Sequence, residues 1–193
     1  MPDAAIETAL AHWAPRLIQN GVDYNDLMTT VARTQTWADW LPQWNRTADE
    51  QADFAAEADE SGHRITAGQA WRRASVNRHF GKFVWTLDAE LVAEATRRSV
   101  RETTEALKRL DRSAERLEFP IDGGRAYANL RRPAGIDPPP YVVLIPGLDS
   151  TKEEFFYFEQ SFLDRGMATI AWTGRARARP ASRCRSGPTT RSR

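Results

Sequence analysis

The sequence predicts an α/β protein in which an all-helical N-terminal domain precedes the first strands of a larger sheet. Two observations support this prediction. Apolar residues recur every three or four positions from residue 3 to about residue 112, which is the period of amphipathic helices. From about residue 113 the apolar residues alternate and then form a strand–helix–strand pattern, which is typical of a parallel sheet. We therefore expect domains at 1–112 and 113–172, and a basic, disordered tail at 173–193.

Five helices are expected in the first domain. Asp3 is a candidate N-cap for the first helix, and Gly21 is expected to end it. The other four are expected from about residue 25, around residues 37–44, at 66–86 and at 87–111. Gly81 falls inside the fourth of these helices and weakens its helical pattern.

Aromatic and histidine residues in this domain are interpreted first as structural. Six of the seven tryptophans fall in it at helical spacing, which favours core packing, and the alternative is that some line an apolar substrate chamber. The three histidines show no metal-ligand or catalytic-triad spacing, so we expect surface or hydrogen-bonded core positions and no metal site. They are His12, His63 and His79.

The second domain is expected to begin with a β-hairpin and to continue with one strand–helix–strand unit. Alternation on both sides of Asp122-Gly123-Gly124 predicts the hairpin, and the Pro-rich stretch 133–140 follows as a stiff link. The continuous apolar run 141–145 predicts a strand buried on both faces. Ser150 and Glu153 have the spacing of a capping box for a helix from about residue 151, and 167–172 is the next strand, expected at an unpaired edge of the sheet.

Composition argues against several classes of partner. The formal net charge is +1, with 27 Lys+Arg and 26 Asp+Glu, yet seven arginines and no acidic residue lie in 173–193. The rest of the chain is therefore mildly acidic and offers no basic footprint for nucleic acid. No apolar run is long enough to cross a membrane, and no secretory signal is visible at the N-terminus. A single cysteine, Cys184, fits a reducing compartment, so the cytoplasm is the expected location.

The turn after the strand at 141–145 is the strongest functional candidate in the sequence. It reads PGLDSTKEEF and joins a strand to a helix. A phosphate loop needs a second glycine immediately before its lysine, and Gly147 has none before Lys152. An oxyanion hole needs only a backbone N–H directly after such a strand, and this is the favoured interpretation. The alternative is a tight turn without a function.

The helical domain, the hairpin with its Pro-rich link and the stretch VVLIPGLDSTKEEF together resemble the α/β-hydrolase family. The similarity is greatest to the branch of 2,6-dihydropseudooxynicotine hydrolases and fungal polyketide chain-shortening hydrolases. The resemblance implies a helical cap over an incomplete α/β-hydrolase sheet. It also implies cleavage of an ester or of a C–C bond next to a ketone in a small molecule, by a Ser-His-Asp triad and without a cofactor. By the same resemblance, the amide of Leu148 is the oxyanion donor, and Gly147 shapes its loop.

The family pattern is expected to continue after Trp172 as D-G-P-G-Q-G-E, whereas this chain reads TGRARARP. Deleting one base from suitable GC-rich codons for the family pattern reproduces residues 172–180, so a frameshift after Trp172 is our hypothesis for the tail. The rival interpretation is a basic arm that binds nucleic acid or an acidic membrane.

The chain contains no G-x-S-x-G nucleophile motif, and the acid and the histidine of a hydrolase triad would follow that motif. The resemblance therefore predicts a truncated, inactive hydrolase. A function of another class is the alternative, namely a helical interaction module with a vestigial sheet that forms a homodimer through its helices.

Overall fold

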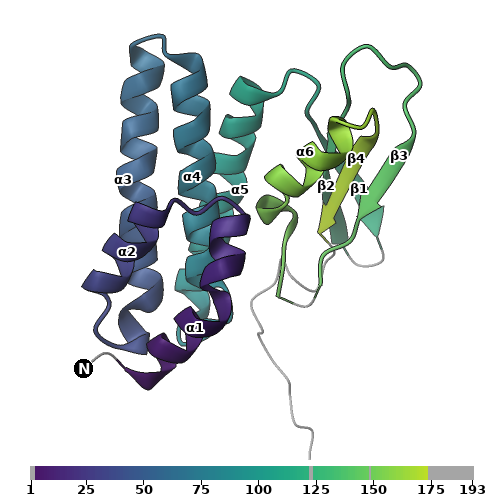
Figure 1. Cartoon of the computed structure of the whole chain (residues 1–193). Helices are drawn as coiled ribbons and strands as arrows, with labels where there is room; N and C mark the ends of the chain where they lie inside the picture. The colour runs from purple at the N-terminus through teal and green to yellow at the C-terminus, as the bar shows by residue number, and fades with distance from the viewer. Residues whose placement is uncertain (1–2, 122–123, 148, 174–193) are drawn as a thin grey trace, which may run out of the picture.

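The computed structural model describes residues 3–121, 124–147 and 149–173, and within them a helical domain lies beside a small mixed sheet (Figure 1). The sequence prediction of a helical region followed by the first strands of an α/β sheet is confirmed. The helical domain contains α1 (Ala4–Gln19), α2 (Tyr24–Arg33), the 3₁₀ turn η1 (Trp37–Asp39), α3 (Trp40–Glu60), α4 (Arg64–Lys82) and α5 (Ala89–Leu110).

Aspartates begin three of these helices. The Asp3 carboxylate accepts a hydrogen bond from the amide of Ala5 at 3.0 Å, as the sequence predicts, and Asp23 caps α2 in the same way. Asp88 accepts from two amides at the start of α5. Each carboxylate satisfies N–H groups that the first helical turn leaves without a partner.

The core of the helical domain is aromatic, and a glycine lets α3 and α4 approach closely. Trp40 and Trp44 are buried, with ring centroids 5.6 Å apart. A Cβ added to Gly81 would lie 2.5 Å from the Cβ of Trp44, so the contact between the two helices depends on this glycine. The residue that weakens the helical pattern of α4 in the sequence therefore has a packing role that only the neighbouring helix reveals.

The sheet has four strands, which are β1 (Glu115–Ile121), β2 (Gly124–Arg131), β3 (Tyr141–Leu144) and β4 (Ala168–Thr173). The strands β1 and β2 form the predicted antiparallel hairpin, whose turn residues 122 and 123 lie outside the described residues. The strands β3 and β4 are parallel and are connected through α6 (Phe156–Leu163), as the strand–helix–strand pattern predicts.

The lateral order of the strands corrects one expectation. The sequence reasoning placed the last strand at an unpaired edge, but the observed order is β1-β2-β4-β3, so β4 pairs with β2 on one side and with β3 on the other. The edge strands of the described sheet are therefore β1 and β3. Hydrophobic patterning reports which faces of a strand are buried and does not report its neighbours, which explains the error.

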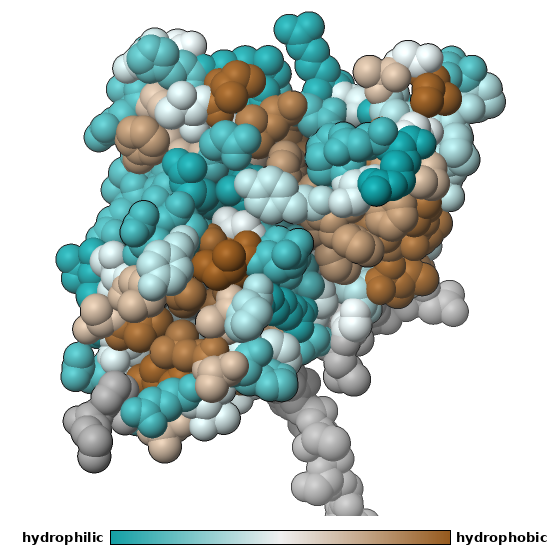
Figure 2. All heavy atoms as spheres, in the orientation of Figure 1, coloured by the Kyte–Doolittle hydropathy of each residue, from teal (hydrophilic) through white to brown (hydrophobic). Residues whose placement is uncertain are grey.

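The third strand is also less buried than expected. Leu144 is buried, but Tyr141 and Val143 are 53% and 57% exposed. The neighbouring Thr169 of β4 donates to Glu159 of α6 at 3.1 Å, so α6 covers one face of the sheet. The face that carries Tyr141 and Val143 is open to solvent in the described part of the chain. Figure 2 presents the opposite face of the sheet domain, on the side of α6, and hydrophobic residues are also gathered at the surface there.

The predicted capping box of Ser150 and Glu153 does not form. A 3₁₀ turn, η2 (Lys152–Glu154), occupies this position, and α6 begins only at Phe156. The Ser150 hydroxyl contacts Glu154, and Glu153 pairs with Lys152. The carboxylates of this turn bind side chains instead of the helix N-terminus, because cations from the turn itself and from the helical domain lie within reach.

Candidate active-site loop and the adjoining cavity

The loop that connects β3 to α6 lies at the carboxyl ends of the two parallel strands, where α/β sheets bind their ligands. Gly147 is exposed in this loop, and a Cβ added to it would meet no heavy atom within 4 Å. The side of the loop at Gly147 is therefore open. Leu148, the predicted oxyanion donor, lies outside the described residues, so its role and the shaping role of Gly147 stay predictions.

The far end of this loop is held by side chains from the helical domain. Nε2 of His79 lies 2.7 Å from Oε2 of Glu154, and a guanidinium nitrogen of Arg16 lies 2.9 Å from Oε1 of the same carboxylate. His79 belongs to α4 and Arg16 to α1, so one glutamate joins two helices to the loop. Both His79 and Glu154 are buried.

The second ring nitrogen of His79 is also satisfied. Nδ1 lies 3.1 Å from the hydroxyl oxygen of Thr151 and 3.4 Å from Nζ of Lys82. Burial and the neighbouring Lys82 lower the pKa of His79, so the imidazole is neutral at pH 7. Its Nε2–H then donates to Glu154, and Nδ1 accepts from Thr151 and Lys82. We call these five residues the interdomain clamp: Arg16, His79, Lys82, Thr151 and Glu154.

Both glutamates of η2 are held in the ionised form. Burial opposes ionisation of Glu154, but the hydrogen bonds from His79 and from the Ser150 hydroxyl, together with the charge of Arg16, prevail and lower its pKa to about 2. Burial likewise opposes ionisation of Glu153, and the adjacent Lys152 lowers its pKa to about 2. The backbone amide of Lys152 donates to the Thr173 hydroxyl at 2.9 Å, which ties the loop to the end of β4. The strand β4 ends at Thr173, which is one residue beyond the predicted domain boundary.

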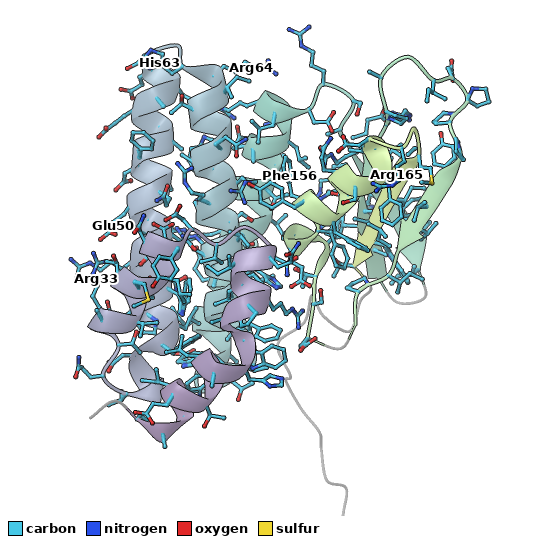
Figure 3. All side chains as sticks on the ribbon, viewed as in Figure 1. Arg33, Glu50, His63, Arg64, Phe156 and Arg165 are labelled. Atoms are coloured by element: carbon cyan, nitrogen blue, oxygen red, sulfur yellow. The ribbon has the colours of Figure 1, made fainter. Side chains whose placement is uncertain are left out.

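A second buried cluster holds α6 on the sheet. Arg131 of β2 pairs with Asp111 at 2.6 Å and with Glu159 at 3.5 Å, and its guanidinium lies 4.5 Å from the ring centroid of Phe156. Figure 3 shows Phe156, the first residue of α6, on the side of this helix that faces the helical domain. Burial raises the pKa of Glu159 to about 7, against the lowering effect of Arg131. This cluster connects β2 and α6 to Asp111 at the end of α5, and it has the character of a structural support.

A cavity of about 510 Å³ opens next to the clamped loop, between α5, the β1–β2 hairpin and η2. Its walls combine apolar side chains of α5 with arginines of the helix and the hairpin. The lining residues are Glu90, Val92, Ala93, Thr96, Arg97, Val100, Arg116, Arg125, Tyr127, Thr151, Lys152, Glu153 and Thr173. A cavity with an apolar wall and a few polar groups is typical of a small-molecule site.

The sequence predicted part of this arrangement. Hydrogen-bonded core or surface histidines were expected, and His79 is a buried, hydrogen-bonded one. The partner Glu154 was not predicted, because 75 residues separate the two side chains in sequence. The charged residues Lys152, Glu153 and Glu154, in the loop after a strand and just before an aromatic helix, are the signal that would have indicated a buried ionic contact.

The described residues contain no group of three His, Cys, Asp or Glu side chains arranged to hold a metal ion. Of the helices in this part of the chain, none combines the length and the apolar character needed to cross a bilayer.

Comparison with known proteins finds similarity to FrsA-like esterases. Residues 17–173 match the family model "Esterase FrsA-like". The 2,6-dihydropseudooxynicotine hydrolase of Paenarthrobacter nicotinovorans is 34% identical over 170 residues, which cover 87% of this chain and 45% of the relative. Esterase FrsA of Salmonella newport (strain SL254) is 28% identical over 148 residues, or 76% of this chain and 35% of that one. The chain therefore spans less than half the length of the curated relatives it matches.

Solved structures give the same result. The crystal structure of 2,6-dihydroxy-pseudo-oxynicotine hydrolase superposes with a TM-score of 0.71 at 34% identity, covering 82% of this chain and 44% of that one. The wild-type AbyA5 structure superposes with a TM-score of 0.55 at 19% identity, over 87% of this chain and 43% of the other, which is a likeness of fold alone.

Proposed function

Because the chain belongs to the FrsA-like esterase family, we propose that it forms the helical cap and the first strands of a serine hydrolase. The proposed reaction is cleavage of an ester, or of a C–C bond next to a ketone, in a small molecule and without a cofactor. The observation that supports this proposal is the loop after β3, which lies at the carboxyl ends of β3 and β4 and is held by the interdomain clamp.

In this proposal the loop supplies half of an oxyanion hole. The amide of Leu148 stabilises the negative charge that develops on a carbonyl oxygen, and Gly147 leaves the approach open. A donor of this kind acts only if its position is fixed before the reaction, since reorganisation during the reaction would cost the energy that the donor contributes. The clamp fixes the loop from residue 151 to residue 154. The helical domain would therefore orient the catalytic loop in addition to covering the site.

An oxyanion donor alone does not break a bond, because it stabilises charge that a nucleophile creates. The 193 residues contain no G-x-S-x-G motif. We propose that this polypeptide by itself does not turn over an ester. Turnover of p-nitrophenyl butyrate that a serine-directed inhibitor abolishes would contradict this part of the proposal.

The oxyanion role can be tested in a chimera that joins residues 1–172 to the remaining C-terminal part of the Paenarthrobacter hydrolase. Leu148→Pro removes the proposed N–H donor, and Leu148→Ala is the matched control because it keeps the amide. We expect the chimera and its Leu148→Ala form to cleave an ester, and Leu148→Pro to lower kcat by roughly 10²–10³-fold. Equal activity of the two variants, with equal circular dichroism spectra, would refute the assignment.

We propose separately that a frameshift after Trp172 produced the tail, of which residues 174–193 lie outside the described residues. It requires that one base be missing after the codon for Trp172. Genomic sequencing across codons 172–180 tests it, and a read that reproduces the present frame would end it. The cytoplasm stays the predicted location, and homodimerisation stays a prediction.

A further inference from the structure

The cavity beside the clamped loop has an uneven distribution of charge. Four basic side chains line it, namely Arg97, Arg116, Arg125 and Lys152, against the two acidic side chains Glu90 and Glu153. Lys152 and Glu153 pair with each other and contribute no net charge. The remaining charge on the walls is therefore positive and comes from arginines of α5, β1 and β2.

These arginines differ in how far they are already neutralised. Arg97 pairs with Glu94 at 2.7 Å, and Arg125 pairs with Glu118, and neither glutamate lines the cavity. Arg116 has no carboxylate within ion-pair distance in the described part of the chain. Its guanidinium lies 4.6 Å from the ring centroid of Tyr127, which orients it by a cation–π contact and leaves its N–H donors available.

The α5 wall opposite the hairpin contains an apolar strip beside the charged Glu90 and Arg97. Val92 and Val100 lie on one face of α5 with Thr96 between them, because residues four apart on a helix share a face, and Ala93 lines the cavity next to Val92. A ligand that fills the cavity would place an apolar body against this face and an acidic group against Arg116. A guanidinium matches a carboxylate in shape, and it forms charge-assisted hydrogen bonds with it.

We propose that this cavity binds a small monocarboxylate with an apolar or aromatic body, and that Arg116 is the residue that recognises the carboxylate. One guanidinium without an acidic partner favours a single negative charge. Glu90 on the wall disfavours a polyanion, because its carboxylate would repel a second negative charge. Thr151, Lys152 and Glu153 belong to both the cavity and the loop after β3. If the cavity also receives the substrate of the proposed hydrolase, that substrate carries a carboxylate, and this extension rests on the proposed function.

Binding can be measured directly on the 193-residue chain by isothermal titration calorimetry. The probe is 4-phenylbutyrate, and its neutral counterpart 4-phenylbutanamide has the same body without the charge. We expect the carboxylate to bind with one site per chain and the amide to bind at least tenfold more weakly. We expect Arg116→Gln to weaken binding of the carboxylate by roughly tenfold or more, as loss of a charge-assisted hydrogen bond requires.

Arg112→Gln is the matched control, because Arg112 is also an exposed arginine and does not line the cavity. It should bind 4-phenylbutyrate as the parent chain does. Equal affinity for acid and amide, equal effects of the two arginine variants, or no binding of either probe would each overturn the proposal. A chimera that cleaves neutral esters while the parent chain fails to bind the acid would overturn only this inference. Binding of the acid by a chimera without activity would overturn only the proposed function.

Discussion

Replacing Glu154 by Gln removes the negative charge that joins the helical domain to the loop after β3. The carboxylate contacts His79 and Arg16 from two different helices and is 4% exposed. A glutamate whose pKa falls from 4.5 in the unfolded chain to about 2 in the folded protein contributes about 3 kcal/mol of stability at pH 7. We therefore expect Glu154→Gln to lower the free energy of unfolding by about 3 kcal/mol at neutral pH.

The pH dependence of this loss has a definite sign. Because the folded-state pKa is lowered, the contribution is fully present above pH 4.5 and disappears as the pH falls through about 2. The difference between the parent chain and Glu154→Gln should therefore shrink from about 3 kcal/mol at pH 7 to about 1.5 kcal/mol at pH 3. A loss due only to altered packing would stay constant over this range.

Urea unfolding followed by tryptophan fluorescence at pH 7, 4 and 3 measures this difference. Glu50→Gln is the control, because Glu50 pairs with Arg33 at the surface (Figure 3) and such a pair is worth at most about 1 kcal/mol. A loss below 1 kcal/mol at pH 7 for Glu154→Gln, or a loss that does not change with pH, would refute the proposed role of the clamp.

Three further predictions concern packing and buried charge. Gly81→Ala should lower the free energy of unfolding in urea by about 1–2 kcal/mol, despite the better helix propensity of alanine, because the added Cβ meets Trp44. The control Gly147→Ala should stay within about 0.5 kcal/mol of the parent chain. Equal stabilities of the two variants would contradict the packing argument. Arg78→Met should lower the free energy of unfolding in urea by about 3–5 kcal/mol, because it leaves Glu102 buried without the guanidinium that lies 2.6 Å away. The additional change Glu102→Leu should recover most of this loss. A double variant that is no more stable than Arg78→Met would contradict the prediction. Because the folded-state pKa of Glu159 is raised to about 7, ionisation of this side chain destabilises the fold as the pH rises from 4.5 through 7. In thermal melts, Glu159→Gln should therefore be more stable than the parent chain at pH 8 and equally stable at pH 4.

The sequence predicted the helices and strands because local rules specify them. Asp3 is followed by apolar residues at helical spacing, and it caps α1 as expected. The hairpin follows from alternation around a Gly-Gly turn, and β4 follows from an apolar run after a helix stop. These features depend on residues within a few positions of one another, so the local sequence is sufficient to predict them.

Errors arose where the outcome depended on residues far away in sequence. Alternation does not report neighbours, so the central position of β4 was missed. The capping box of Ser150 and Glu153 was expected from local spacing. Instead, Glu153 forms an ion pair with Lys152. Ser150 contacts Glu154, which also binds Arg16 and His79. A local interaction of about 1 kcal/mol gives way to charge-assisted contacts that exist only after the domains have packed together.

The sequence by itself determined the two-part architecture, the position of the loop after β3 and the family resemblance, because hydrophobic period and a contiguous motif are properties of the chain alone. Only the tertiary structure decided that His79 meets Glu154, and that α5 and the hairpin form a cavity lined by three arginines. The physical reason is that a buried charge is tolerated only beside its partner, and that partner is brought there by the packing of whole elements.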